Sequence, residues 1–269
     1  MTFRGTRVQI RRPRAQAGAR AADRPGMPRP STARRLTRAL AGLAGLGVGG
    51  AALADPAAYV FVPYADPGAR IVAWAAGTAR GRDGARETQQ TLELGGNPAG
   101  RWFTALYAAW ASPDGAGYRF DEWSWLNHVA LTEPGAAPVD VGALCEIERA
   151  REQDEGTGLL CGPTLQADTD RLQLNLNLLL GRHVGADEPE PWRLHYQWQA
   201  KALLAPGVEL GAQGFGEAGA PPSHVLGPAI FAKVAQGAGR ALQFDAAWLV
   251  GIGAGSPRDV LRVRVQQQF

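Results

Sequence analysis

The chain has 269 residues, 45% of them hydrophobic, which is enough for one large domain or two ordinary ones. Its isoelectric point of about 9.1 alone would suggest a nucleic-acid partner. However, residues 1–54 hold 11 of the 28 Lys and Arg and one of the 25 Asp and Glu, so the chain from Asp55 onward has a net charge near −7. We therefore expect no nucleic-acid partner for the mature protein.

The N-terminal region has the pattern of an export signal. A basic stretch at 28–38 precedes a short apolar run at 39–51, and Ala52-Leu53-Ala54 fits the small-x-small cleavage pattern, which leaves Asp55 as the mature N-terminus. Residues 27–54 are therefore predicted to be a signal peptide starting at Met27. Residues 1–26 are interpreted as an over-extended N-terminus, the less favoured alternative being a basic nucleic-acid-binding arm.

From residue 70 onward, apolar and polar residues alternate in short segments separated by Gly, Pro, Asp and Asn. Twelve strands are predicted, at roughly 70–79, 86–95, 101–111, 119–132, 139–150, 158–168, 170–182, 192–204, 207–217, 224–235, 240–252 and 259–269. Each is close to the ~9–11 residues that a tilted strand needs to cross a bilayer. The even number returns both ends of the chain to one side of the membrane.

The segment 171–180 shows why we expect a lipid-facing barrel. Its even-numbered leucines form a continuous apolar face, while Gln173, Asn175 and Asn177 point the other way. Aromatic residues gather near strand ends, as in the girdles of outer-membrane barrels. The predicted fold is all-β, a transmembrane antiparallel up-and-down barrel over residues 70–269, preceded by a periplasmic segment at 55–69.

The last ten residues alternate and end on Phe269. A terminal aromatic on the last strand is typical of bacterial outer-membrane barrels, where the barrel-assembly machinery reads it. We therefore expect a monomer in the outer membrane of a Gram-negative bacterium, with the membrane lipid and that machinery as partners.

Two cysteines, Cys145 and Cys161, lie on either side of a predicted hairpin tip near Gln153. In the oxidising periplasm they could form a disulfide, because the hairpin would place them opposite each other. The alternative, that they are two small residues facing lipid, remains equally open.

Several stretches make the chain similar to a known family. They include Tyr59–Tyr64, Glu122–Asn127, Gly162–Gln166 and Gly211–Glu217. Through these stretches residues 58–269 resemble an uncharacterised family of proteobacterial outer-membrane β-barrels. The resemblance implies fold and location but brings no activity and no catalytic residues. Gln267 departs from the usual pattern, because such barrels commonly have an aromatic two residues before the terminal Phe.

The faces opposite the apolar ones supply candidates for the lining of the lumen. These are Glu122, His128, Asn175, Asn177, Arg193, His195, Gln197, Lys201, Glu209, Gln213, Asp245, Arg262 and Arg264. The leading hypothesis is a narrow pore for small polar solutes. The alternative is a closed structural or partner-binding barrel, in which Asp245, Arg262, Arg264, Glu209 and Lys201 would join in one salt-bridge network. Residues 55–69 could plug the lumen or lie against the periplasmic rim.

An enzyme is disfavoured. Ser124 and His128 share a strand face, but positions i and i+4 on a strand are roughly 13 Å apart, too far for a nucleophile and its base. We expect no catalytic, cofactor-binding or metal-binding residues, and no cofactor.

Overall fold

A computed structural model describes residues 55–152, 156–187, 191–219 and 221–269. The predicted signal peptide at 27–54 and the predicted over-extension at 1–26 lie outside these residues. No helix in the described ranges is long and apolar enough to cross a membrane.

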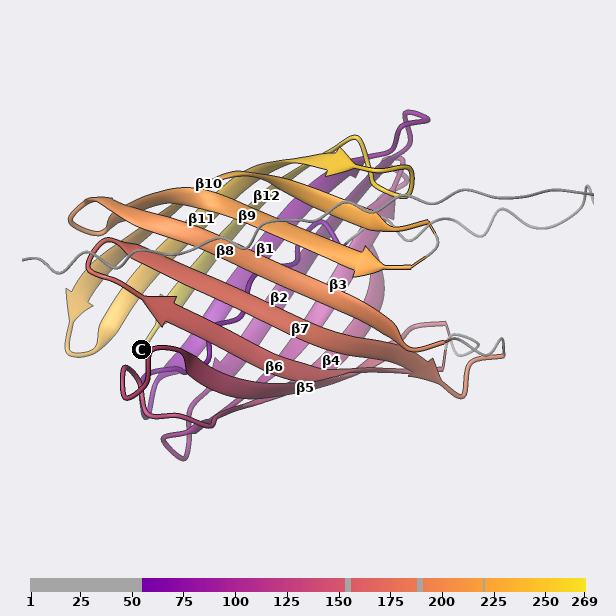
Figure 1. Cartoon of the computed structure of the whole chain (residues 1–269). Helices are drawn as coiled ribbons and strands as arrows, with labels where there is room; N and C mark the ends of the chain where they lie inside the picture. The colour runs from indigo at the N-terminus through magenta and orange to yellow at the C-terminus, as the bar shows by residue number, and fades with distance from the viewer. Residues whose placement is uncertain (1–54, 153–155, 188–190, 220) are drawn as a thin grey trace, which may run out of the picture. The chain divides into compact units, whose positions relative to one another are not determined.

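The predicted strands are confirmed, with bounds that differ by a few residues at most. The described chain forms one closed barrel of antiparallel strands, each paired with its neighbours in sequence, and β1 closes the ring against β12 (Figure 1). The strands are β1 (Arg70–Arg80), β2 (Arg86–Gly96), β3 (Trp102–Pro113), β4 (Arg119–Ala130), β5 (Asp140–Ala150), β6 (Thr157–Asp168), β7 (Leu172–Val184), β8 (Arg193–Ala205), β9 (Val208–Ala218), β10 (Ser223–Gly237), β11 (Arg240–Ile252) and β12 (Asp259–Gln268). The predicted transmembrane β-barrel fold is therefore correct.

The alternation along each strand separates the lumen from the lipid face. On β7, Leu174 and Leu176 are exposed on the outside, whereas Asn175 and Asn177 are buried inside. Large apolar side chains are exposed around the whole ring, among them Trp74, Leu106, Trp125 and Trp248. In hydrocarbon every backbone group must be paired within the protein, and closure of the ring achieves this.

Both ends of the barrel domain meet at one rim, which we call the C-terminal rim. The Phe269 amide donates to the Arg70 carbonyl at 2.9 Å, so the last residue is held beside the first residue of β1. Tight turns connect strands at this rim, such as the two residues between β8 and β9. In the turn between β10 and β11, Ala238 adopts a φ of 51° and Gly239 a φ of 76°.

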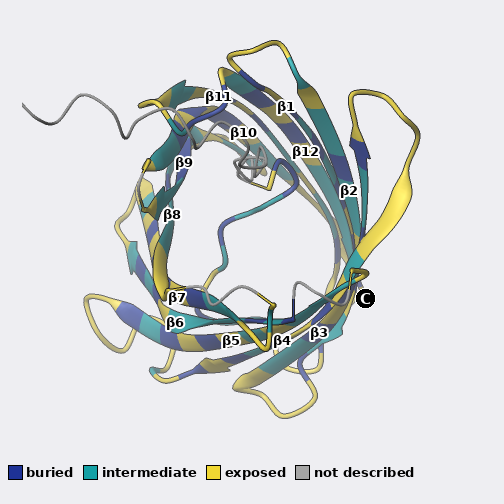
Figure 2. Ribbon diagram, turned by 90° about the vertical axis from the view of Figure 1, so that its right-hand side faces the viewer, coloured by how far each residue is buried: buried dark blue, intermediate teal, exposed yellow. Residues whose placement is uncertain are grey.

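Residues 55–69 enter the barrel. This N-terminal segment runs inside the ring of strands, with Asp55 toward the rim opposite the termini and Ala69 at the C-terminal rim (Figure 2). The Pro56 carbonyl lies against Gly77 of β1, while Asn97, in the turn after β2, accepts a bond from the Gly68 amide at 2.9 Å. Of the two positions that the sequence left open, the structure has the segment in the lumen.

The two cysteines satisfy both alternatives at once. Cys145 and Cys161 are direct cross-strand partners on β5 and β6, with their Cα atoms 4.2 Å apart, and a disulfide joins them. Their register places them on the lipid face, since the adjacent residues Leu144 and Glu146 point into the lumen. The bond therefore fastens the β5–β6 hairpin from outside the barrel.

Candidate functional site

The lumen collects the polar residues that the sequence assigned to it. Glu122, Gln197 and Arg264 line one cavity, and His128, Lys201, Gln213, Asp245 and Arg262 line another. The remaining predicted lining residues lie on the same inward register: Asn175, Asn177, Arg193, His195 and Glu209. Arg193 and His195 sit near the opposite rim beside Glu217, with Arg193 Nη1 donating to Glu217 Oε1 at 2.6 Å.

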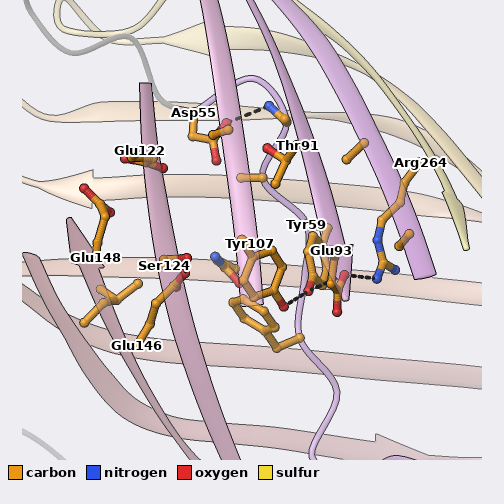
Figure 3. Close-up of a pocket in the computed structure, with 18 residues that line it drawn as sticks. Asp55, Tyr59, Thr91, Glu93, Tyr107, Glu122, Ser124, Glu146, Glu148 and Arg264 are labelled. Carbon is orange, nitrogen blue, oxygen red and sulfur yellow. Dashed lines mark hydrogen bonds and ion pairs between the residues drawn. The ribbon is translucent and has the colours of Figure 1, made fainter. Parts of the chain in front are cut away.

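The N-terminal segment is held at its centre by Tyr59. Its hydroxyl hydrogen-bonds the Tyr107 hydroxyl at 2.6 Å and donates to Glu93 Oε2 at 3.2 Å (Figure 3). Arg264 places its guanidinium 3.9 Å from the centre of the Tyr59 ring and donates to the same Glu93 oxygen at 2.8 Å. The carboxylate of Glu93, the phenol of Tyr107 and the guanidinium of Arg264 thus tie Tyr59 to β2, β3 and β12. We call Tyr59, Glu93, Tyr107 and Arg264 the Tyr59 node.

Toward the C-terminal rim the segment is held by barrel amides. Asn177 Nδ2 donates to the Phe61 carbonyl at 3.2 Å, and Gln166 Nε2 donates to the Tyr64 hydroxyl at 2.7 Å. At the rim itself Gln268 Nε2 donates to Asp66 at 2.7 Å. These contacts come from β6, β7 and β12, so the segment is fixed to several parts of the wall.

Apolar contacts hold the segment from two sides. Val60 packs into a cluster from β1 and β9–β12 that includes Phe215 and Leu249. Tyr59 and Phe61 pack on the other side, against a cluster from β3, β4, β5 and β7. The segment therefore spans the lumen and bridges its two walls.

Two cavities remain beside the segment. An acidic cavity of about 170 Å³ lies toward the opposite rim, and an amide-rich cavity of about 310 Å³ lies toward the C-terminal rim. Tyr59, Phe61, Glu93 and Arg264 line both of them, so these residues stand between the two spaces. Three residues of the Tyr59 node, together with Phe61, therefore separate the two cavities.

The two cavities differ in charge. Besides Glu93 of the node, the acidic cavity is lined by carboxylates on β4 and β5 and by the first described residue: Asp55, Glu122, Glu146 and Glu148 (Figure 3). The amide-rich cavity is lined by Lys201, Lys233, Arg262 and the side-chain amides Gln199, Gln213, Gln243, Gln266 and Gln268. A solute crossing the lumen would thus meet acidic groups first on one side and amides with basic groups on the other.

The charges of the wall form separate pairs. Arg262 donates to Asp245 at 2.8 Å and Lys201 donates to Glu209 at 2.8 Å, as the sequence suggested. Arg264 takes Glu93 as its partner, a residue that sequence reasoning did not select. These six residues thus form three separate pairs, and the single network expected of a closed barrel is not seen among the described residues.

Side-chain amides form a ladder across four strands. Asn175 donates to Gln166 at 2.8 Å, Gln199 to Asn175 at 2.9 Å, and Gln213 to Gln199 at 3.2 Å. Each donor lies one strand further round the barrel, so the chain of bonds runs from β6 to β9. The ladder satisfies polar groups that the lumen would otherwise leave buried without partners.

Ser124 and His128 have partners other than each other. The Ser124 hydroxyl donates to Glu146, and His128 Nε2 hydrogen-bonds the Thr164 hydroxyl at 2.8 Å. Both side chains thus contribute to the polar lining of the wall. Ser124 is hydrogen-bonded to Glu146 and not to His128.

The closed ring, the apolar exterior and the polar lumen define an outer-membrane β-barrel. The sequence matches none of the known protein-family models and none of the curated proteins. Among solved structures, the fold is similar to that of the COG4313 outer membrane channel from Pseudomonas putida F1, with a TM-score of 0.55 and 12% identity over 80% of this chain and 99% of that one. This likeness shows the shared fold.

Two further solved structures align at lower similarity. One is the KdgM porin in complex with disordered oligogalacturonate, with a TM-score of 0.49 and 9% identity over 74% of this chain and 98% of that one. The other is the β domain of the Bordetella autotransporter Brka, with a TM-score of 0.49 and 13% identity over 76% of this chain and 100% of that one.

Proposed function

We propose that the protein is a narrow pore for small polar solutes, restricted by its own N-terminal segment. The observation that supports this most directly is the division of the lumen into two polar cavities by a few side chains of the Tyr59 node. A packed salt-bridge network would fill the lumen from wall to wall, whereas here the wall charges are paired locally. The described likeness to an outer membrane channel supports the proposal at the level of fold.

Charge in the lumen sets the expected selectivity. Glu122, Glu146 and Glu148 line the acidic cavity on one wall. Fixed charge of one sign in a pore favours ions of the opposite sign. We therefore propose that the pore admits cations and neutral polar solutes in preference to anions.

The test is conductance of the purified chain beginning at Asp55, in a planar bilayer, beside a chain that lacks residues 55–64. We expect small discrete steps for the former and larger steps for the latter, because the deletion removes Tyr59 and the rest of the segment that crosses the lumen. Heat-modifiable migration in gels shows that each barrel has folded. A folded but silent intact chain would refute the pore and leave the closed barrel.

A closed barrel is the second candidate, and the packing of the segment between both walls favours it. In that case the deletion would open a pore that the intact chain never shows, even at high voltage. We further propose that the protein acts as a monomer without enzymatic activity. We also propose that it belongs to the proteobacterial barrel family that its sequence resembles.

A further inference from the structure

The start of the N-terminal segment lies among carboxylates. Asp55 is within electrostatic range of Glu87 on β2, Asp121 and Glu122 on β4, and Glu148 on β5. Glu122 and Glu148 are diagonal neighbours across the β4–β5 pair, and both point at the same end of the acidic cavity as Asp55 (Figure 3). Several negative charges thus converge on one small region.

Few positive groups oppose them. In the described part of the chain, no Lys or Arg side chain forms an ion pair with Glu87, Asp121 or Glu122. His183 on β7 lies 3.7 Å from Glu148, and Arg262 on β12 is close enough to act on Asp55 but is already paired with Asp245. Like charges held together in a partly dry site need a counter-charge.

A second observation points to a missing donor at this place. Gln89 of β2 is only 6% exposed, and its Oε1 atom is buried without a hydrogen-bond partner among the described residues. Gln89 lies directly across from Gly77, and the Pro56 carbonyl rests on Gly77. The unpartnered acceptor is therefore close to Pro56, the residue that follows Asp55. This acceptor is therefore available to a new donor.

The sequence supplies a group that is both a donor and a cation. Cleavage after Ala54 would leave Asp55 with a free α-ammonium group, which carries three N–H donors and one positive charge. The direction of the segment fits, because its Asp55 end is the one that lies in the acidic cavity.

We propose that the α-ammonium group created by signal-peptide cleavage is the counter-ion of this carboxylate cluster and locks the N-terminal segment into the lumen. The new group lies in the acidic cavity with Glu122 and Glu148, and Gln89 is an acceptor close to the next residue, Pro56. Removal of the export signal thereby completes the plug. The inference does not depend on whether the pore conducts.

The test is the pKa of the α-amine, measured by NMR from the pH dependence of the ¹³Cα shift of Asp55 in the folded, unmodified mature chain. The Asp55 signal is assigned by its loss in a chain with a different N-terminus. Ordinary α-amines have a pKa near 7.7–8.0. The neighbouring carboxylates should raise the pKa of this α-amine by at least about one unit, so that at any pH below the ordinary range the neutral form is about tenfold less populated. Mass spectrometry of the N-terminal peptide establishes that the chain starts at Asp55.

Matched variants separate the cluster from general charge effects. Glu122→Gln together with Glu148→Gln should return the pKa of the α-amine to its ordinary range. Glu217→Gln removes a carboxylate of β9 that pairs with Arg193 of β8, and it should leave the pKa of the α-amine raised. An ordinary pKa in the folded wild-type chain, an unchanged pKa in the double variant, or a mature chain that does not start at Asp55 would each overturn the proposal. If the chain shows no conductance in a planar bilayer, only the proposed pore is refuted.

Discussion

Replacing Gly77 with alanine should release the N-terminal segment without damage to the barrel wall. A Cβ atom on Gly77 would lie 1.9 Å from the Pro56 carbonyl oxygen and 2.4 Å from its carbon. Ordinary contact begins at 3.4 Å, so one partner must move by about 1.5 Å. β1 is paired along its length to both β2 and β12, so it is the segment that must move.

The size of the effect follows from the cost of overpacking. Adding one methyl group to a filled site costs about 1–3 kcal/mol. If this cost raises the free energy of the docked state alone, the equilibrium between docked and undocked segment shifts toward the undocked state by roughly 5- to 150-fold. Single-channel recording should therefore show the larger conductance level of the deletion chain appearing with a correspondingly higher frequency.

Gly95→Ala is the matched control for this change. Gly95 also faces the lumen, on the neighbouring strand β2, but the nearest neighbours of its added methyl are side-chain atoms of Phe103, Ala105 and Ile71, none of them in the N-terminal segment. The control should conduct like the wild-type chain. Equal conductance of Gly77→Ala and wild type, with both barrels folded, would refute the idea that docking of Pro56 on Gly77 restricts the pore.

Other changes test the remaining features. Arg264→Gln leaves Glu93 buried without its cationic partner and should lower the free energy of unfolding by about 3–5 kcal/mol. Adding Glu93→Gln should recover most of this loss. If urea titrations show that the two substitutions lower the free energy of unfolding additively, the pairing is contradicted. Changing both Cys145 and Cys161 to Ala should cost at most about 3 kcal/mol, the value for a loop of this length, and should abolish the effect of reductant on the urea midpoint. Leu176→Arg on the lipid face should cost about 2–4 kcal/mol, but Gln173→Arg on the lumen face of the same strand should cost far less; similar losses for both would mean that the two faces of β7 are misassigned.

The strands were predictable because lipid imposes a strict rule on them. A residue that faces hydrocarbon must be apolar, so β7 reads as leucines alternating with Gln173, Asn175 and Asn177. The same rule identifies inward positions, which is why pairs on adjacent strands, such as Asp245 with Arg262, could be expected.

The position of the N-terminal segment could not be predicted from the alternation of apolar and polar residues. Its contacts join residues far apart in the chain, as when Tyr59 meets Tyr107 and Glu93. The Glu93–Arg264 pair also escapes a rule based on adjacent strands, because β1 lies between β2 and β12. One signal was present: the inner face of β1 carries Ala73, Ala75, Gly77 and Ala79, all small. An inner face without bulk leaves room that another part of the chain must fill.

The way the segment is held argues that it is a separable part of the molecule. Within residues 57–66, the described contacts to the wall are made through side chains, as at Tyr59 and Tyr64, or through barrel amides that reach a segment carbonyl, as Asn177 does. A strand of the wall exchanges a ladder of backbone bonds with both neighbours, so its loss would open the ring. Loss of the segment breaks no such ladder, and every strand of the wall keeps its partners. The lumen can therefore open without opening the ring of the wall, which is why conductance should respond to a substitution, such as Gly77→Ala, that leaves every strand paired.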